Sequence, residues 1–97
     1  MVEWIFMFNV PKERQKEFLN FVKTGTKPWT ESHGCLGYNV WQAVGEDTFM
    51  KRMEFKDMAA FEKFRPLGEQ NQEFKALIEK FQSYIENAVI KPYIKLT

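Results

Sequence analysis

HGCLGYNVWQAVGEDTFMKRMEF, residues 33–55, is the stretch that decides the fold of this chain. Its side chains alternate in character over two runs, 36–43 and 48–55. A period of two indicates β-strands, because successive side chains point to opposite faces of a sheet. Between the runs, Val44-Gly45-Glu46-Asp47 supplies the glycine and acidic residues that a four-residue hairpin loop favours. The stretch therefore predicts an antiparallel hairpin in the middle of the fold.

Pairing Ala43 with Thr48 sets the two faces of this hairpin. One face is the more apolar and should be covered by helices, although it also contains Lys51. A lysine amine on such a face must reach water along its stem or meet an anionic partner. The alternative is a register slipped by one residue. The first face carries Leu36, Tyr38, Val40, Phe49, Lys51, Met53 and Phe55, and the second Asn39, Trp41, Met50, Arg52 and Glu54.

Composition limits the classes of function. The 97 residues make a single domain, residues 1–97, and 14 basic against 13 acidic side chains leave a net charge of +1. Without a block of like charge, nucleic-acid binding is not expected. Cys35 is the only cysteine, so no internal disulfide can form and a cytoplasmic protein is expected. Neither a signal peptide nor a membrane span is expected, because no basic segment leads into a long apolar run.

The residues before the hairpin predict a strand and then helical turns. Val2–Asn9 alternates two largely apolar sets, which fits a strand covered on both faces. Pro11 suits the first turn of a helix over Lys12–Thr24, with Asn9 or Val10 as its cap and Gly25 as its stop. Thr26–His33 should form one or two more turns, capped by Thr26 and ended by Gly34.

The residues after the hairpin predict two helices and a strand. Asp57 is a suitable N-cap for a short helix, Met58–Phe64, which Pro66 ends. A longer helix over Gly68–Glu86 has an apolar stripe, and Ala88–Leu96 should be an edge strand because Pro92 cannot donate a ladder hydrogen bond. The resulting order predicts an α+β fold, the ferredoxin-like split βαβ with an antiparallel sheet.

Two segments resemble the antibiotic biosynthesis monooxygenase family of dimeric α/β barrels. His33-Gly34-Cys35-Leu36-Gly37-Tyr38 is similar to the family's entry into the second strand. Residues 48–55, followed by Lys56 and Asp57, resemble its third strand, which ends in an aromatic residue before a short helix. The resemblance spans nearly the whole chain and implies a homodimer. It also implies a small-molecule site, although such domains host several chemistries as well as pure ligand binding.

The chain differs from the haem-binding members of the family at the positions that those members use to bind or degrade haem. Where those members carry an active-site histidine, near the start of the long helix, this chain has Gln70 and Asn71. Where haem-degrading relatives use an asparagine on the first strand and a tryptophan closing the third, it has Phe6 and Phe55. Haem and other cofactors are therefore not expected. The resemblance instead makes Phe6, Phe55 and Asn71 candidates for substrate binding.

Few residues could carry chemistry. His33 is the only histidine, and with Cys35 it gives too few ligands for a zinc site. His33 is either a solvated residue or, with Lys51, one of the two candidate catalytic groups. Trp29 and Tyr38 either pack in the core or hold the ring of a substrate. If the register is right, Lys51, His33 and Tyr38 could meet at the polar end of an apolar cleft.

Two hypotheses of function follow. The first is a cofactor-independent monooxygenase acting on a small aromatic or quinol-like compound that supplies its own electrons. In it Lys51 or His33 would favour the deprotonated substrate, and Trp29, Tyr38 and Phe55 would enclose the ring. The second is a non-catalytic domain of the same fold that binds or senses a small apolar ligand. The sequence alone leaves both open.

Overall fold

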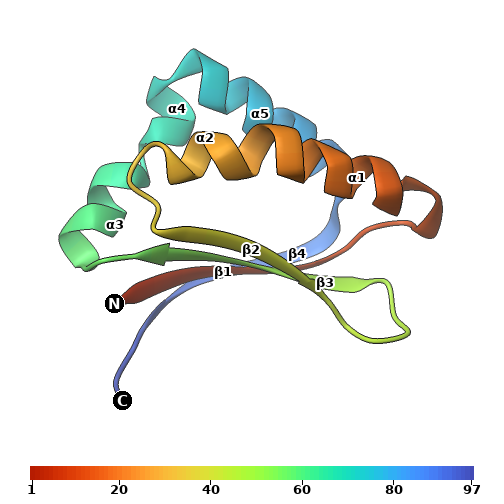
Figure 1. The fold of residues 1–97 in the computed structure, drawn as a ribbon, viewed down its shortest axis with the longest axis horizontal. Coiled ribbons are helices and arrows are strands. Elements are labelled where there is room, and N and C mark those ends of the chain that lie inside the picture. Colours follow the sequence, from red (N-terminus) through yellow and green to blue (C-terminus); the bar gives the residue numbers. More distant parts are fainter.

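The computed structural model describes all residues, 1–97, and contains a four-stranded antiparallel sheet with every helix on one side, as Figure 1 shows. The strand order is β2-β3-β1-β4, so the two strands that follow the first helical segment lie next to each other. This arrangement confirms the predicted ferredoxin-like α+β fold. The strands are β1 (Val2–Asn9), β2 (Gly37–Gln42), β3 (Thr48–Phe55) and β4 (Glu86–Ile94).

The hairpin has the predicted register. The backbone N–H of Ala43 donates to the carbonyl oxygen of Thr48 over 2.9 Å, and Gly45 takes a φ of 76° in the loop. Every second residue of β3, from Phe49 to Phe55, is buried beneath the helices. Leu36 is the one member of the predicted apolar face that is misplaced. It precedes the first residue of β2, so the strand alternation does not reach it, and its side chain is 61% exposed.

The helical segment after β1 is longer than predicted. A 3₁₀ turn η1 (Lys12–Arg14), α1 (Gln15–Phe21), a π-helical turn η2 (Val22–Thr26) and α2 (Lys27–Glu31) follow one another without a break. The prediction that Gly25 stops the first helix is therefore wrong. Gly25 instead permits close packing, because a Cβ there would lie 3.1 Å from Phe21 and 3.3 Å from Leu77.

The predicted caps of these helices are also wrong. Pro11, with its ψ of 139°, takes the N-cap position itself, and no side chain caps the turn. Asn9 instead uses its amide to donate to the Thr48 hydroxyl over 3.2 Å. Thr26 does not cap α2 with its side chain, because the chain is already helical there and its hydroxyl is bonded to Tyr38.

The second helical region contains three helices, α3 (Met58–Phe64), α4 (Leu67–Gln70) and α5 (Gln72–Tyr84). Asp57 caps α3 as predicted, since its Oδ1 accepts from the Ala60 N–H over 2.9 Å. The single helix predicted from Gly68 is wrong, because Asn71 is extended, with φ −109° and ψ 118°, and begins a new helix as its N-cap. No helix of the structure combines the length and apolarity needed to cross a membrane.

Most aromatic side chains fill the layer between the sheet and the helices. Phe8, Phe18, Phe49 and Phe81 form its centre, with neighbouring ring centroids 5.5 to 6.0 Å apart. These edge-to-face and stacked pairs add to the free energy gained by burying the rings. The other face of the sheet has no helix over it (Figure 1). Met7 and Trp41 are 41% and 55% exposed there, so only one of the two faces predicted to be covered is covered within the chain.

Candidate functional site

A cavity of about 400 Å³ lies between the sheet and α5, within the size range of small-molecule sites. Trp4 and Phe6 from β1 and Met53 from β3 form its floor, and Phe74, Ile78 and Phe81 from α5 its roof. The strand period of two and the three- and four-residue spacing along α5 turn these side chains toward each other. The lining also includes Arg65, which is exposed, and Ile90 of β4, which is 46% exposed, so the cavity reaches the surface.

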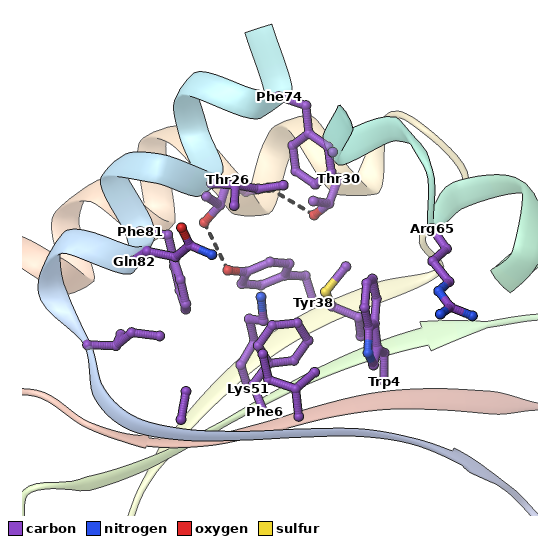
Figure 2. Close-up of a pocket in the computed structure, with 16 residues that line it drawn as sticks. Trp4, Phe6, Thr26, Thr30, Tyr38, Lys51, Arg65, Phe74, Phe81 and Gln82 are labelled. Atoms are coloured by element: carbon purple, nitrogen blue, oxygen red, sulfur yellow. Dashed lines mark hydrogen bonds between the residues drawn. The ribbon is translucent and has the colours of Figure 1, made fainter. Parts of the chain in front are cut away.

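Lys51 brings an amine into this apolar cavity. It lies on β3 between Phe49 and Met53, its side chain is 6% exposed, and no hydrogen bond or ion pair reaches its Nζ. Nζ lies 3.6 Å from the ring centroid of Phe6 and 4.4 Å from that of Phe81. Figure 2 shows the amine directed away from the sheet toward the space below α5.

Burial changes the protonation of Lys51. Because the charged form loses its hydration and gains no carboxylate partner, burial lowers the pKa of Lys51 to about 7. The ring faces of Phe6 and Phe81 attract the ammonium form but do not replace water. Among the titratable groups around the amine, Tyr38 and Arg65 line the cavity, and Cys35 lies just before β2. None of the sixteen lining residues is an aspartate or glutamate.

Hydroxyl groups form the polar end of the cavity. The Tyr38 and Thr26 hydroxyls are 2.9 Å apart, and the Thr30 hydroxyl donates to the Thr26 carbonyl oxygen over 2.9 Å. Burial raises the pKa of Tyr38, so its hydroxyl stays protonated over the physiological range. The Tyr38 ring centroid is 5.3 Å from the Lys51 Nζ, which places a base and two hydroxyls in one lining (Figure 2).

The structure brings together three of the seven residues expected at the site: Lys51, Tyr38 and Phe6. His33 and Trp29 lie outside the cavity. Trp29 is stacked between the His33 ring, at 3.7 Å, and the ring of Phe74, at 4.1 Å, so it stands behind one wall. His33 is exposed, and its Nδ1 lies 2.7 Å from the Trp29 carbonyl oxygen. The expected meeting of His33 with Lys51 is therefore not seen.

The other two residues expected at the site, Phe55 and Asn71, have structural roles outside the cavity. Phe55 is 0% exposed and packs against Phe61 and Phe64, with ring centroids 5.6 and 5.1 Å away, so nothing that enters the cavity touches it. Asn71 is held at the start of α5, where its Oδ1 accepts from the Phe74 N–H over 3.0 Å. Neither Phe55 nor Asn71 lines the cavity.

Sequence reasoning missed several lining residues. Trp4 could have been found, because it is two residues from Phe6 and must share its side of β1. Phe74, Ile78 and Phe81 belong to the apolar stripe of the predicted long helix, and the spacing of that stripe does not show where packing leaves a cavity. Thr26 gave no usable signal, since a threonine before a proline-containing helix is typical of a cap. No group of three His, Cys, Asp or Glu side chains is placed to hold a metal ion.

Solved structures share this fold. A conserved protein from Methanosarcina mazei is 20% identical and superposes with a TM-score of 0.76 over 98% of this chain and 92% of its own. A structure described as an antibiotic biosynthesis monooxygenase is 15% identical, with a TM-score of 0.76 over the whole of both chains. A NIPSNAP domain protein from Burkholderia xenovorans is 10% identical, with a TM-score of 0.76 over 99% of this chain and 95% of its own.

At these identities the structural matches establish the fold and leave the chemistry open. A comparison with curated protein sequences gives no match. The family description that does match this chain is antibiotic biosynthesis monooxygenase, over residues 1–80. That region contains β1 to β3 and most of α5, and with them eleven of the sixteen cavity-lining residues, Lys51 and Tyr38 included. The chain therefore belongs to the antibiotic biosynthesis monooxygenase family.

Proposed function

We propose that the cavity binds a small aromatic molecule with an acidic hydroxyl group, a phenol or quinol, and that the protein promotes its oxygenation without a cofactor. The observation that carries this proposal is the Lys51 amine, unpartnered in an otherwise apolar cavity of about 400 Å³. Aromatic and aliphatic walls favour a ring over a sugar or a peptide. A phenolic hydroxyl directed at Lys51 would give the amine the partner that the chain does not supply.

In this proposal Lys51 acts as the base. With a pKa of about 7, a large fraction of the amine is neutral at physiological pH and can accept the hydroxyl proton. The resulting ammonium and phenolate attract each other strongly because the walls exclude water. Tyr38 or Thr26 can donate a hydrogen bond to the same oxygen. The phenolate is more electron-rich than the phenol, so it gives up electrons to O₂ more readily, and the substrate itself is the reductant.

The second candidate function is ligand binding without reaction. It is favoured by the placement of His33, which leaves Lys51 as the only base among the cavity-lining residues. The similarity to NIPSNAP domain proteins also fits it, since the fold is not restricted to proteins described as monooxygenases. Both functions use the same cavity, and they differ in whether bound ligand consumes O₂.

The binding test compares 1-naphthol with naphthalene, which has the same rings and no hydroxyl. We expect Lys51→Met to weaken 1-naphthol binding by roughly 1 to 3 kcal/mol, about fivefold to more than a hundredfold in Kd, with little change for naphthalene. Lys56→Met is the matched control, because Lys56 is exposed outside the cavity. Equal losses for both ligands, or none for either, would overturn the assignment of a phenol.

The catalytic test measures O₂ uptake with 1,4-naphthohydroquinone in an oxygen electrode. Uptake above the spontaneous rate, reduced in Lys51→Met and unchanged in Lys56→Met, is the result expected of a monooxygenase-type enzyme. Binding of 1-naphthol that depends on Lys51, without protein-dependent uptake for any quinol tried, would identify the ligand-binding function instead.

A further inference from the structure

We propose that Lys51 is also a nucleophile toward carbonyl compounds, and that its Nζ condenses with an apolar aldehyde in the cavity to form an imine. This inference shares the cavity with the proposed function but does not depend on oxygenation or on phenol binding. Three features of the site carry it: the absence of any partner for the amine, the apolar walls beside it, and the hydroxyl groups in the same lining.

The amine is free to react. Its Nζ makes no hydrogen bond within the chain, and it lies over the rings of Phe6 and Phe81, 3.6 and 4.4 Å from their centroids. No carboxylate lines the cavity to hold the ammonium form. A lysine desolvated in a hydrophobic pocket keeps its lone pair available, which is the condition for nucleophilic attack on a carbonyl carbon.

The chemistry balances without a further reagent. The Nζ lone pair forms a bond to the carbonyl carbon, and the carbonyl oxygen takes a proton to give a carbinolamine. Loss of that oxygen as water, with the second amine proton, leaves a C=N double bond. The overall change is amine plus aldehyde to imine plus water, with no electron transferred. The hydroxyls of Tyr38 and Thr26, 2.9 Å apart, are available to pass protons to the oxygen.

The walls set the class of aldehyde. Phe6, Met53, Ile78 and Phe81 offer no hydrogen bonds to a hydroxylated aldehyde, so a sugar would lose its hydration without compensation. An aryl or alkyl aldehyde instead gains by leaving water. The fit is therefore to apolar aldehydes that fill part of the cavity of about 400 Å³.

The test traps the imine with sodium cyanoborohydride and benzaldehyde, at about pH 7.5, and locates the benzyl group by peptide mass spectrometry. The amine of Lys51, whose pKa burial lowers to about 7, is mostly neutral there, whereas a lysine with the reference pKa of about 10.4 is mostly protonated. We expect Lys51 to carry most of the label. Lys51→Arg keeps a positive charge and cannot form an imine, so the label on the peptide that contains residue 51 should fall by about tenfold or more. Lys56→Arg should label like the parent.

Two further arms make the outcome decisive. Glyceraldehyde should label Lys51 no more than the exposed lysines, because the walls do not compensate its hydroxyls, and naphthalene should compete with benzaldehyde. Labelling spread over the exposed lysines and unchanged in Lys51→Arg would overturn the proposal, as would an unlabelled Lys51 in folded protein. Labelling of Lys51 without selective 1-naphthol binding would support imine formation and contradict the proposed phenol site. Selective 1-naphthol binding without labelling of Lys51 would support the phenol site and contradict imine formation.

Discussion

Lys51 shows how strand geometry can force a charged side chain into an apolar layer. The pairing of Val40 with Lys51 and of Phe6 with Lys51 fixes three strands in one register, so the alternative of a slip by one residue is excluded. A slip would turn Phe49 and Met53 to the open face along with Lys51 and forfeit the burial of several apolar side chains. The Lys51 amine therefore stays buried between the sheet and the helices, where the cavity beside it leaves room for an amine without a partner.

The buried amine predicts a pH-dependent stability. In the unfolded chain Lys51 holds its proton up to about pH 10.4, whereas in the fold its pKa is about 7. Between these values the unfolded state binds more protons, so the free energy of unfolding rises with pH. The buried Cys35 thiol, whose pKa is raised, opposes this above about pH 8.5. From about pH 6 to 8.5 we expect Lys51 to contribute a rise of about 2 kcal/mol.

Urea unfolding of Lys51→Met measures that contribution. The variant keeps a side chain of similar length without the charge, so it should be at least as stable as the parent and should lack this part of the pH dependence. Lys56→Met should follow the parent. Parallel curves for the parent and Lys51→Met would show that the amine stays charged in the fold.

The hydroxyl pair at the polar end of the cavity gives a second prediction. Tyr38→Phe removes one partner of the 2.9 Å bond and leaves the buried Thr26 hydroxyl unpaired, which should cost about 1 to 3 kcal/mol of unfolding free energy. Thr26→Val should cost a similar amount, and the double variant less than the sum, because the pair acts as a unit. Chemical denaturation of the four proteins measures the coupling. Additive losses would mean that the bond contributes nothing.

At the scale of elements, local sequence patterns predicted the features of the fold that depend on interactions between residues close in sequence. The hairpin, the Asp57 cap and the order of strands and helices along the chain all follow from periodicity and turn chemistry within a few residues. The passage of the helix through Gly25 could not be predicted, because it depends on Leu77 from α5 packing against that glycine. The alternation of β2 and β3 indicated Tyr38 and Lys51 as residues of one face, and both line the cavity. The cavity itself depends on how side chains from eight elements fill space, which no single sequence pattern contains.

The break between α4 and α5 predicts a structural role for Asn71. Asn71→Ala removes the acceptor for the Phe74 N–H and should lower the unfolding free energy by about 1 kcal/mol, as loss of an N-cap does. Asn71→Asp keeps the acceptor and should be as stable as the parent, since a negative charge suits a helix N-terminus. Asp57→Ala at the cap of α3 is the matched control. A drop in 1-naphthol affinity in Asn71→Asp, at unchanged stability, would instead return Asn71 to the ligand site.

At the scale of the whole molecule, the open face of the sheet is unlike a solvent-facing surface. Trp41 pairs with Met50, Met50 with Met7, and Met7 with Val89, so one apolar row crosses all four strands. Beside it the Arg52 guanidinium is paired with Glu3, and the Arg52 Nε has no hydrogen-bond partner. A contiguous apolar patch of this kind on a small domain is typical of a protein interface. A second copy of the chain is the partner that the family resemblance implies.

The last prediction is that two copies associate through this open face as a symmetric homodimer. Such an interface should bury on the order of 2,000 Å² or more. Light scattering should therefore return about twice the chain mass of 11.6 kDa at micromolar concentration. Met7→Lys puts a charge in the middle of the apolar row, at a side chain 41% exposed in the single chain, and should shift the protein to a folded monomer. Val44→Lys, at a loop position 99% exposed, should leave the dimer intact. A parent protein that is folded and monomeric would contradict the prediction, and so would Met7→Lys that remains dimeric, because the row would then lie outside the interface.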